Sequence, residues 1–150
     1  MPIRTLFGQL ILSAADERDI AQAIGDAEKG TRGEVRVHVE RSCPDGDAVA
    51  RAKQMFAALG MHETQDDTGV LLYVAWGDRV AAVWAGSGIH AAAQQGFWDD
   101  IVGELAYGFS HKEGGRAIVR AVRRIGNLLR KHAPGEDHAG DELPNELSIG

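Results

Sequence analysis

The fold is decided by residues 69–85, which read GVLLYVAWGDRVAAVWA in this chain of 150 residues. Residues 69–76 are apolar throughout, as expected of a central strand that is covered on both faces. Gly77-Asp78 is a two-residue hairpin signal, so Val80–Ala85 is expected to return as an antiparallel strand. Upstream, residues 34–40 (EVRVHVE) alternate strictly, which predicts another strand with one buried face.

Helical segments surround these strands. One helix is predicted over residues 14–29 with Ser13 as its N-cap, and a second begins near Ala48 and ends at Gly60. Two further helical segments follow the last strand, and the final one is expected to open with a capping box at residues 110–113. A strand, a helix and a strand in this order imply a parallel pair with a right-handed crossover. We therefore expect an α/β fold, a three-layer α/β/α sandwich with a central mixed sheet of about four strands.

The composition is that of an ordinary globular domain, with 44% hydrophobic and 25% charged residues. The longest apolar run, residues 70–76, is far shorter than the roughly 20 residues that a membrane span needs. A single cysteine, Cys43, excludes an intrachain disulfide framework and a Cys-rich zinc site. Because Gly8 and Gln9 interrupt the short N-terminal apolar stretch, we predict no secretory signal and expect a cytoplasmic protein.

The net charge of −6 is unevenly distributed along the chain. Five of the 22 acidic residues lie in residues 133–150, which leaves 17 against the 16 basic residues of residues 1–132. We therefore divide the chain into an α/β domain (1–132) and an acidic C-terminal tail (133–150). Leu143 and Leu147 are expected to anchor this tail on a helix surface of the domain, and the alternative is a disordered end.

The last predicted helix is strongly basic and has no acidic residue after Glu113. Such a helix can bind nucleic acid, or the acidic tail can neutralise it within the fold. Because interleaved aromatic residues and a nucleic-acid motif are both missing, we expect neutralisation and no nucleic-acid partner. The basic residues are Arg116, Arg120, Arg123, Arg124, Arg130 and Lys131.

Strand polarity brings acidic residues to one end of the sheet. Glu34 starts one strand, and Asp66 and Asp67 lead into its parallel neighbour, so all three are expected at the same sheet end. A helical segment farther along adds Asp100 and Glu104, whose like charges are mildly destabilising four residues apart unless a cation lies between them. Because Ca²⁺ and Mg²⁺ bind carboxylate and carbonyl oxygens, these five residues are the candidate metal ligands. The alternative is that they are solvated turn residues and helix-start acids.

Residues 86–91, GSGIHA, match the dinucleotide fingerprint G-x-G-x-x-A. The context argues against a dinucleotide, because the preceding strand is a hairpin partner rather than the first strand of a parallel unit. The glycines more simply allow a sharp turn. A third interpretation is that the free N–H groups at this helix start bind an anion or a coordinated water.

Three motifs resemble the TPM domain family in their order and spacing. They are Asp67-Thr68-Gly69 before the apolar strand, Asp78-Arg79-Val80, and Ala85-Gly86-Ser87-Gly88-Ile89. That family includes thylakoid-lumen proteins linked to photosystem II repair and many bacterial proteins. The resemblance implies an α/β/α sandwich, divalent-cation binding and, from plant members, acid phosphatase activity. It places Asp67 at the acid of the family's Asp-Asn-Gly motif, with Thr68 instead of Asn, and Ser87 where short relatives often have an acid.

Three hypotheses about function follow. The first is a domain that binds Ca²⁺ or Mg²⁺ at the Asp67 end of the sheet. The second is a metal-dependent, acid phosphatase-like hydrolase, in which the metal polarises a phosphoryl oxygen and a carboxylate positions water. The third is an interaction or scaffolding module, with a protein partner, for the maintenance of membrane proteins. The sequence indicates neither the partner nor the oligomeric state.

Overall fold

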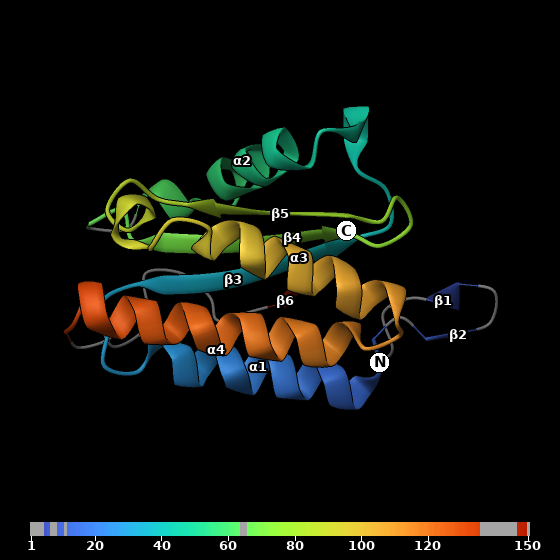
Figure 1. Cartoon of the computed structure of the whole chain (residues 1–150), viewed down its shortest axis with the longest axis horizontal. Helices are drawn as coiled ribbons and strands as arrows, with labels where there is room; N and C mark the ends of the chain where they lie inside the picture. Colours follow the sequence, from blue (N-terminus) through green and yellow to red (C-terminus); the bar gives the residue numbers. More distant parts are fainter. Residues whose placement is uncertain (1–4, 7–8, 11, 64–65, 136–146, 150) are drawn as a thin grey trace.

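The computed structural model describes residues 5–6, 9–10, 12–63, 66–135 and 147–149. Its centre is a mixed sheet of four strands in the order β5-β4-β3-β6. β3 (Glu34–Glu40) and β4 (Gly69–Ala75) run parallel, and β5 (Val80–Ala85) is antiparallel to β4. Figure 1 shows β5, β4 and β3 side by side in this order. β6 (Leu147–Ile149) lies parallel to β3 at the edge of the sheet.

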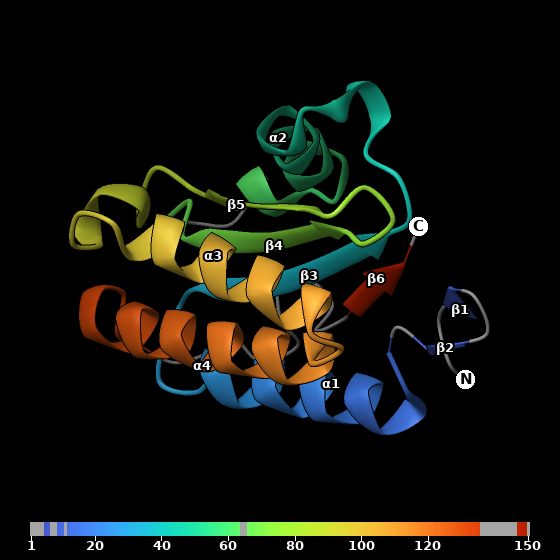
Figure 2. The ribbon, with the colours of Figure 1, turned by 45° about the vertical axis from the view of Figure 1, so that its right-hand side comes forward.

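Helices cover both faces of this sheet. α1 (Ala14–Glu28), α3 (Phe97–Ser110) and α4 (Gly114–His132) lie on one face, and α2 (Ala48–Ala58) lies on the other (Figure 2). The predicted three-layer α/β/α fold is therefore confirmed. The shorter elements are the hairpin of β1 (Thr5–Leu6) and β2 (Gln9–Leu10) and the 3₁₀ turns Pro44–Gly46, Met61–Glu63 and His90–Ala92.

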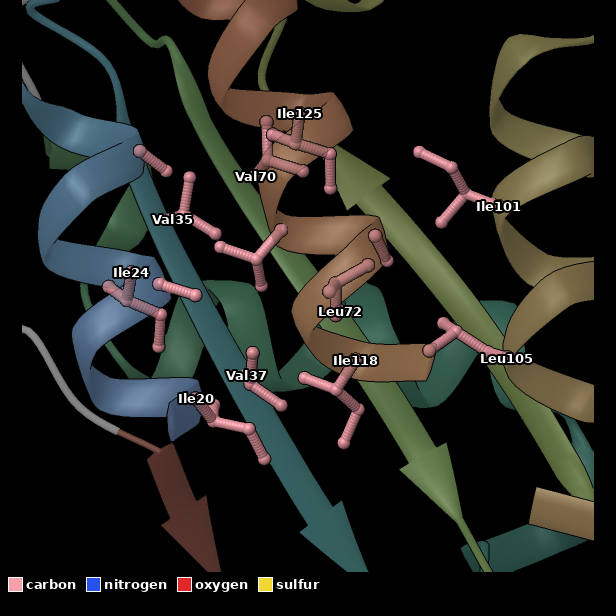
Figure 3. Close-up of a cluster of buried hydrophobic side chains, with 14 of the residues drawn as sticks. Ile20, Ile24, Val35, Val37, Val70, Leu72, Ile101, Leu105, Ile118 and Ile125 are labelled. Carbon is pink, nitrogen blue, oxygen red and sulfur yellow. The ribbon is translucent and has the colours of Figure 1, made fainter. Parts of the chain in front are cut away.

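The larger core lies between the sheet and the three-helix layer (Figure 3). Val37 and Leu72 from the sheet and Ile24, Leu105 and Ile118 from the helices are fully buried there. Burying an aliphatic side chain of this size contributes about 1.5–3 kcal/mol, so this cluster is a main source of the stability of the fold. Smaller clusters pack under α2 on the opposite face.

The helix ends follow the predicted chemistry at one position and depart from it at another. Ser13 caps α1 through a reciprocal pair of hydrogen bonds with Asp16, 3.0 and 2.9 Å long, as predicted. The predicted capping box at residues 110–113 is wrong, because α3 continues to Ser110 and Lys112 turns the chain with a φ of 61°. In the described part of the chain, no helix combines the length and the apolar character needed to cross a membrane.

The strand β3 differs from its prediction because both of its faces are buried. All seven of its residues are buried, including His38 and Glu40 on the polar side. Buried polar groups are tolerated where they are hydrogen-bonded, and both of these side chains have such partners. The alternation therefore predicts the strand correctly, but the expectation that its polar face is exposed is wrong.

Two parts of the predicted tail belong to the described residues. The Ala133 oxygen accepts a 2.9 Å hydrogen bond from the Arg32 N–H, directly after α4. Leu147 lies in a strand paired with β3 and is partly buried against the larger core, and the anchoring of the tail on a helix surface stays a prediction. Leu143 and the five acidic residues of the tail lie outside the described residues.

Candidate functional site

Two loops meet at the end of the sheet where β3 and β4 begin and β5 ends. Asp67 leads into β4 with a φ of 52°, a left-handed conformation that is uncommon outside glycine. Its main-chain oxygen accepts a 2.9 Å hydrogen bond from the Gly88 N–H. Its Oδ2 accepts from the N–H and the hydroxyl of Ser87, at 2.9 and 2.7 Å. The carboxylate of Asp67 is thereby fixed between the loop before β4 and the loop after β5.

The glycines on either side of Ser87 allow this close approach. A Cβ on Gly86 would lie 2.2 Å from the main-chain oxygen of Asp67, and one on Gly88 would lie 2.0 Å from that of Asp66. A side chain at either glycine would therefore force the two loops apart. Because β5 is antiparallel to β4, it does not begin the parallel βαβ unit that a dinucleotide site requires.

The second carboxylate oxygen of Asp67, Oδ1, is buried and has no hydrogen-bond partner among the described residues. The hydroxyl oxygen of the neighbouring Thr68 is also buried and has no hydrogen-bond partner among the described residues. A buried polar atom without a partner costs about 1–3 kcal/mol, more when it is charged, and is commonly explained by a water molecule or an ion. Asp67 is therefore the predicted ligand whose surroundings fit a cation best.

Glu34 and Asp66 lie at the same sheet end as Asp67, where strand polarity predicted them. Glu34 is buried at the start of β3, and its N–H lies 3.4 Å from the oxygen of Thr68. Asp66 forms an ion pair with Arg32 at 3.0 Å, and both side chains are more than a third exposed. The negative charge of Asp66 is thus partly balanced by an arginine.

Asp100 and Glu104 lie on α3, beside a shallow pocket of about 350 Å³ that also includes Tyr107 and Arg120. Oε1 of Glu104 accepts a 2.6 Å hydrogen bond from Nη1 of Arg124. Arginines of α4 therefore supply positive charge beside these carboxylates. In the described ranges, no three His, Cys, Asp or Glu side chains are grouped so that they could hold a metal ion. That all five predicted ligands share one cation stays a prediction.

The basic face of α4 borders a groove of about 510 Å³ between α4 and α1. One wall carries acidic residues of α1 and the other carries arginines of α4. A uniformly positive surface would favour the nucleic-acid backbone, whereas this groove presents both signs of charge. The charged lining residues are Asp16, Asp19, Asp26, Arg116, Arg120 and Arg123.

A second group of polar side chains lies on the sheet face that carries α2, and we call it the Glu40 cluster: His38, Glu40, Arg51 and Tyr73. Arg51 donates from Nε and Nη2 to the two carboxylate oxygens of Glu40, at 2.8 and 3.0 Å. The Tyr73 hydroxyl donates to Oε2 of Glu40 over 2.5 Å. Nε2 of His38 lies 3.3 Å from Oε1 of Glu40. The cluster therefore joins β3, β4 and α2.

The Glu40 cluster has fixed protonation states near neutral pH. The hydrogen bonds from Arg51, together with those from Tyr73 and His38, lower the pKa of Glu40 to about 2. Burial lowers the pKa of His38, and burial with the hydrogen bond to Glu40 raises the pKa of Tyr73. A general acid or base needs a pKa near the working pH. These shifts favour a structural role over proton transfer.

Sequence reasoning missed this cluster because its members lie far apart in the chain. One local signal was the set of polar residues at alternating positions of β3, which the alternation assigns to an exposed face. Tyr73 inside the otherwise aliphatic run of β4 was a second signal, since a buried tyrosine hydroxyl usually finds a hydrogen-bond partner.

Comparison with known proteins gives one family and several structures. A family model described as the TPM domain matches residues 8–128. The NMR structure of the BA42 protein from the psychrophilic bacterium Bizionia argentinensis has a TM-score of 0.80 and 35% identity, and the match covers 93% of this chain and 95% of that one. No curated protein sequence matches at a significant level.

Two more distant structures share the fold alone. The N-terminal domain of the cg2496 protein from Corynebacterium glutamicum has 15% identity and a TM-score of 0.61, covering 79% of this chain and 74% of its own. The N-terminal domain of a protein from P. gingivalis has 17% identity and a TM-score of 0.69, covering 84% of this chain and 83% of its own. The fold is therefore retained at low sequence identity.

Proposed function

Because this chain belongs to the TPM domain family, we propose that it binds a divalent cation, Ca²⁺ or Mg²⁺, at the sheet end where Asp67 lies. The observation that carries the proposal is the buried Oδ1 of Asp67, which has no hydrogen-bond partner among the described residues. Ser87 binds the other oxygen with two hydrogen bonds and so orients the carboxylate. One oxygen is thus held in place while the second is left for a ligand.

The chemistry of the surrounding groups suits a hard cation. Ca²⁺ and Mg²⁺ prefer carboxylate, carbonyl and water oxygens, and the loops at Asp67 and Gly86 bring carboxylate and main-chain oxygens close together. Glu34 and Asp66 are the further carboxylates at this sheet end. A site with few carboxylates binds weakly, so we expect a dissociation constant on the order of 10⁻⁴–10⁻³ M.

Thermal melting tests the proposal. At about ten times the dissociation constant, a ligand that binds only the folded state stabilises it by about 1.4 kcal/mol, or roughly 3–6 °C in a domain of this size. We expect 5–10 mM Ca²⁺ or Mg²⁺, about ten times a millimolar dissociation constant, to raise the Tm of the wild type but not that of Asp67→Asn. NaCl at matched ionic strength controls for general salt effects.

Asp45→Asn is the matched control variant. Asp45 is also an aspartate with positive φ, 61° against 52° for Asp67, but it lies in an exposed turn at the opposite end of β3. Asn tolerates this conformation, so both substitutions remove a charge without straining the backbone. The Ca²⁺ response should persist in Asp45→Asn. An unchanged wild-type Tm, or equal responses in both variants, would contradict the proposal.

The hydrolase and the interaction module stay predictions that rest on the resemblance. A bound divalent cation could supply Lewis-acid chemistry to a phosphate ester. An aryl phosphate assay on the wild type and Asp67→Asn, with and without Mg²⁺, would distinguish hydrolysis from binding alone. Metal-dependent turnover that the substitution abolishes would support the hydrolase, and equal residual rates would indicate contamination.

A further inference from the structure

The edge strand β6 lies outside the residues that the family model matches. The family match ends at residue 128, well before β6 begins. β6 pairs with only three of the seven residues of β3, namely Val37, His38 and Val39. Figure 2 shows it beside β3 at the margin of the sheet. A short parallel strand from outside the matched region thus occupies the edge of a longer strand.

The contacts of β6 combine main-chain pairing with specific side-chain contacts. Leu147 packs against the larger core and supplies an apolar anchor. The hydroxyl oxygen of Ser148 lies 2.8 Å from Nδ1 of His38 and 3.4 Å from the main-chain oxygen of Val37. Strand addition to a sheet edge has this form, since main-chain bonds provide affinity and alternate side chains provide specificity.

The receiving side is organised by the domain itself. Nε2 of His38 contacts Glu40, which Arg51 and Tyr73 hold in place. The imidazole that meets Ser148 is therefore positioned by β3, β4 and α2 rather than by β6. Because these contacts do not involve β6, we expect this edge of β3 to keep its conformation, and to accept another strand, when β6 is released.

We infer that the edge of β3 at Val37, His38 and Val39 is a strand-binding site that β6 occupies within its own chain. Besides β6, the site binds an extended segment of a partner protein. This segment has the pattern of β6, a large apolar residue followed by Ser or Thr. The tethered strand competes at a high effective concentration, on the order of millimolar, so the partner binds when β6 is released. A three-residue terminal strand opens at a much lower free-energy cost than the whole domain.

A synthetic peptide of residues 143–150 is the probe, and the protein is the full chain carrying Leu147→Asp, which removes the apolar anchor of β6. We expect this variant to bind the peptide and to shift the NMR amide signals of Val37, His38 and Val39. The wild type should bind at least tenfold more weakly, because its own strand occupies the edge. A scrambled peptide should not bind, and a peptide with Ala in place of Ser148 should bind several-fold more weakly.

Three results would overturn the inference. The first is that the folded Leu147→Asp variant leaves the peptide unbound. The second is that the variant forms stable dimers by light scattering, which would assign the edge to a second copy of this chain. The third comes from native-state hydrogen exchange on the wild type, which needs no folded variant. We expect the amides of β6 to exchange through local opening, faster than those of β4. If the amides of both strands exchange at the same rate, through global unfolding, β6 is an integral strand of the sheet and the inference is wrong.

Discussion

The hydroxyl of Tyr73 donates a 2.5 Å hydrogen bond to the carboxylate of Glu40, and Arg51 binds both oxygens of the same carboxylate from α2. Glu40 is almost fully buried, so Glu40→Gln leaves the Arg51 guanidinium without its counter-charge. We expect a loss of about 2–4 kcal/mol in the free energy of unfolding, measured by urea denaturation. Glu104→Gln is the control, because it breaks a Glu–Arg pair that is about 40% exposed and should cost less than about 1 kcal/mol.

The low pKa of Glu40 predicts acid sensitivity. Its pKa is about 2 in the folded state and 4.5 in an unfolded chain, so the folded state binds this proton more weakly. The stabilisation is therefore present above pH 4.5 and is lost as the pH falls from 4.5 to 2. The difference corresponds to about 3 kcal/mol. Urea denaturation at several pH values should show that Glu40→Gln loses less stability over this range than the wild type, and parallel curves would contradict the shift.

The lowered pKa of His38 predicts a second dependence of stability on pH, at higher pH than that of Glu40. Burial lowers the pKa of His38 below 6.5, so the folded state binds a proton at this side chain more weakly than the unfolded state does. The stabilisation is complete above pH 6.5 and decreases as the pH falls below that value. His38→Gln should remove this part of the pH dependence below pH 6.5, as urea denaturation at several pH values would show. His111→Gln, at an exposed position after α3, should leave it unchanged.

Local sequence patterns were sufficient for the centre of the fold. The apolar run of β4, the turn after it and the return of β5 follow from periodicity and turn chemistry, which act between near neighbours. The same reasoning placed Glu34, Asp66 and Asp67 at one sheet end, because the direction of parallel strands follows from the crossover helix.

Contacts between distant segments were beyond such reasoning. β6 contains three residues and therefore has no measurable period, and its partner Val37 lies 110 residues before Leu147. Alternation in β3 cannot reveal whether its polar face meets water or a second layer. The unpartnered Oδ1 of Asp67 depends on the packing of two loops, and no residue pattern encodes it directly.

Alanine substitutions at two helix glycines are expected to have opposite effects on stability, because one glycine is closely packed and the other is not. A Cβ on Gly126 of α4 would lie 2.8 Å from Cα and Cβ of Ala27 in α1, whereas one on Gly103 of α3 would meet nothing within 4 Å. Gly126→Ala should force the two helices apart and cost about 1–3 kcal/mol. Gly103→Ala should stabilise the protein by about 0.5–1 kcal/mol, since alanine favours the helix. Thermal melting of both variants checks the sign, and a stabilising Gly126→Ala would show that the helices can separate freely.

Gly86→Ala connects the geometry of the loops to the proposed cation site. The new Cβ would lie 2.2 Å from the main-chain oxygen of Asp67 and 2.5 Å from its Oδ1, so one of the two loops has to move. We expect a loss of about 2 kcal/mol or more, because the clash is with main-chain atoms that cannot rotate away. The displaced carboxylate should also lose its response to Ca²⁺ in thermal melting, whereas Gly103→Ala should keep it. If Gly86→Ala is destabilised and its Tm still rises with Ca²⁺ as in the wild type, the cation binds elsewhere than at Oδ1 of Asp67.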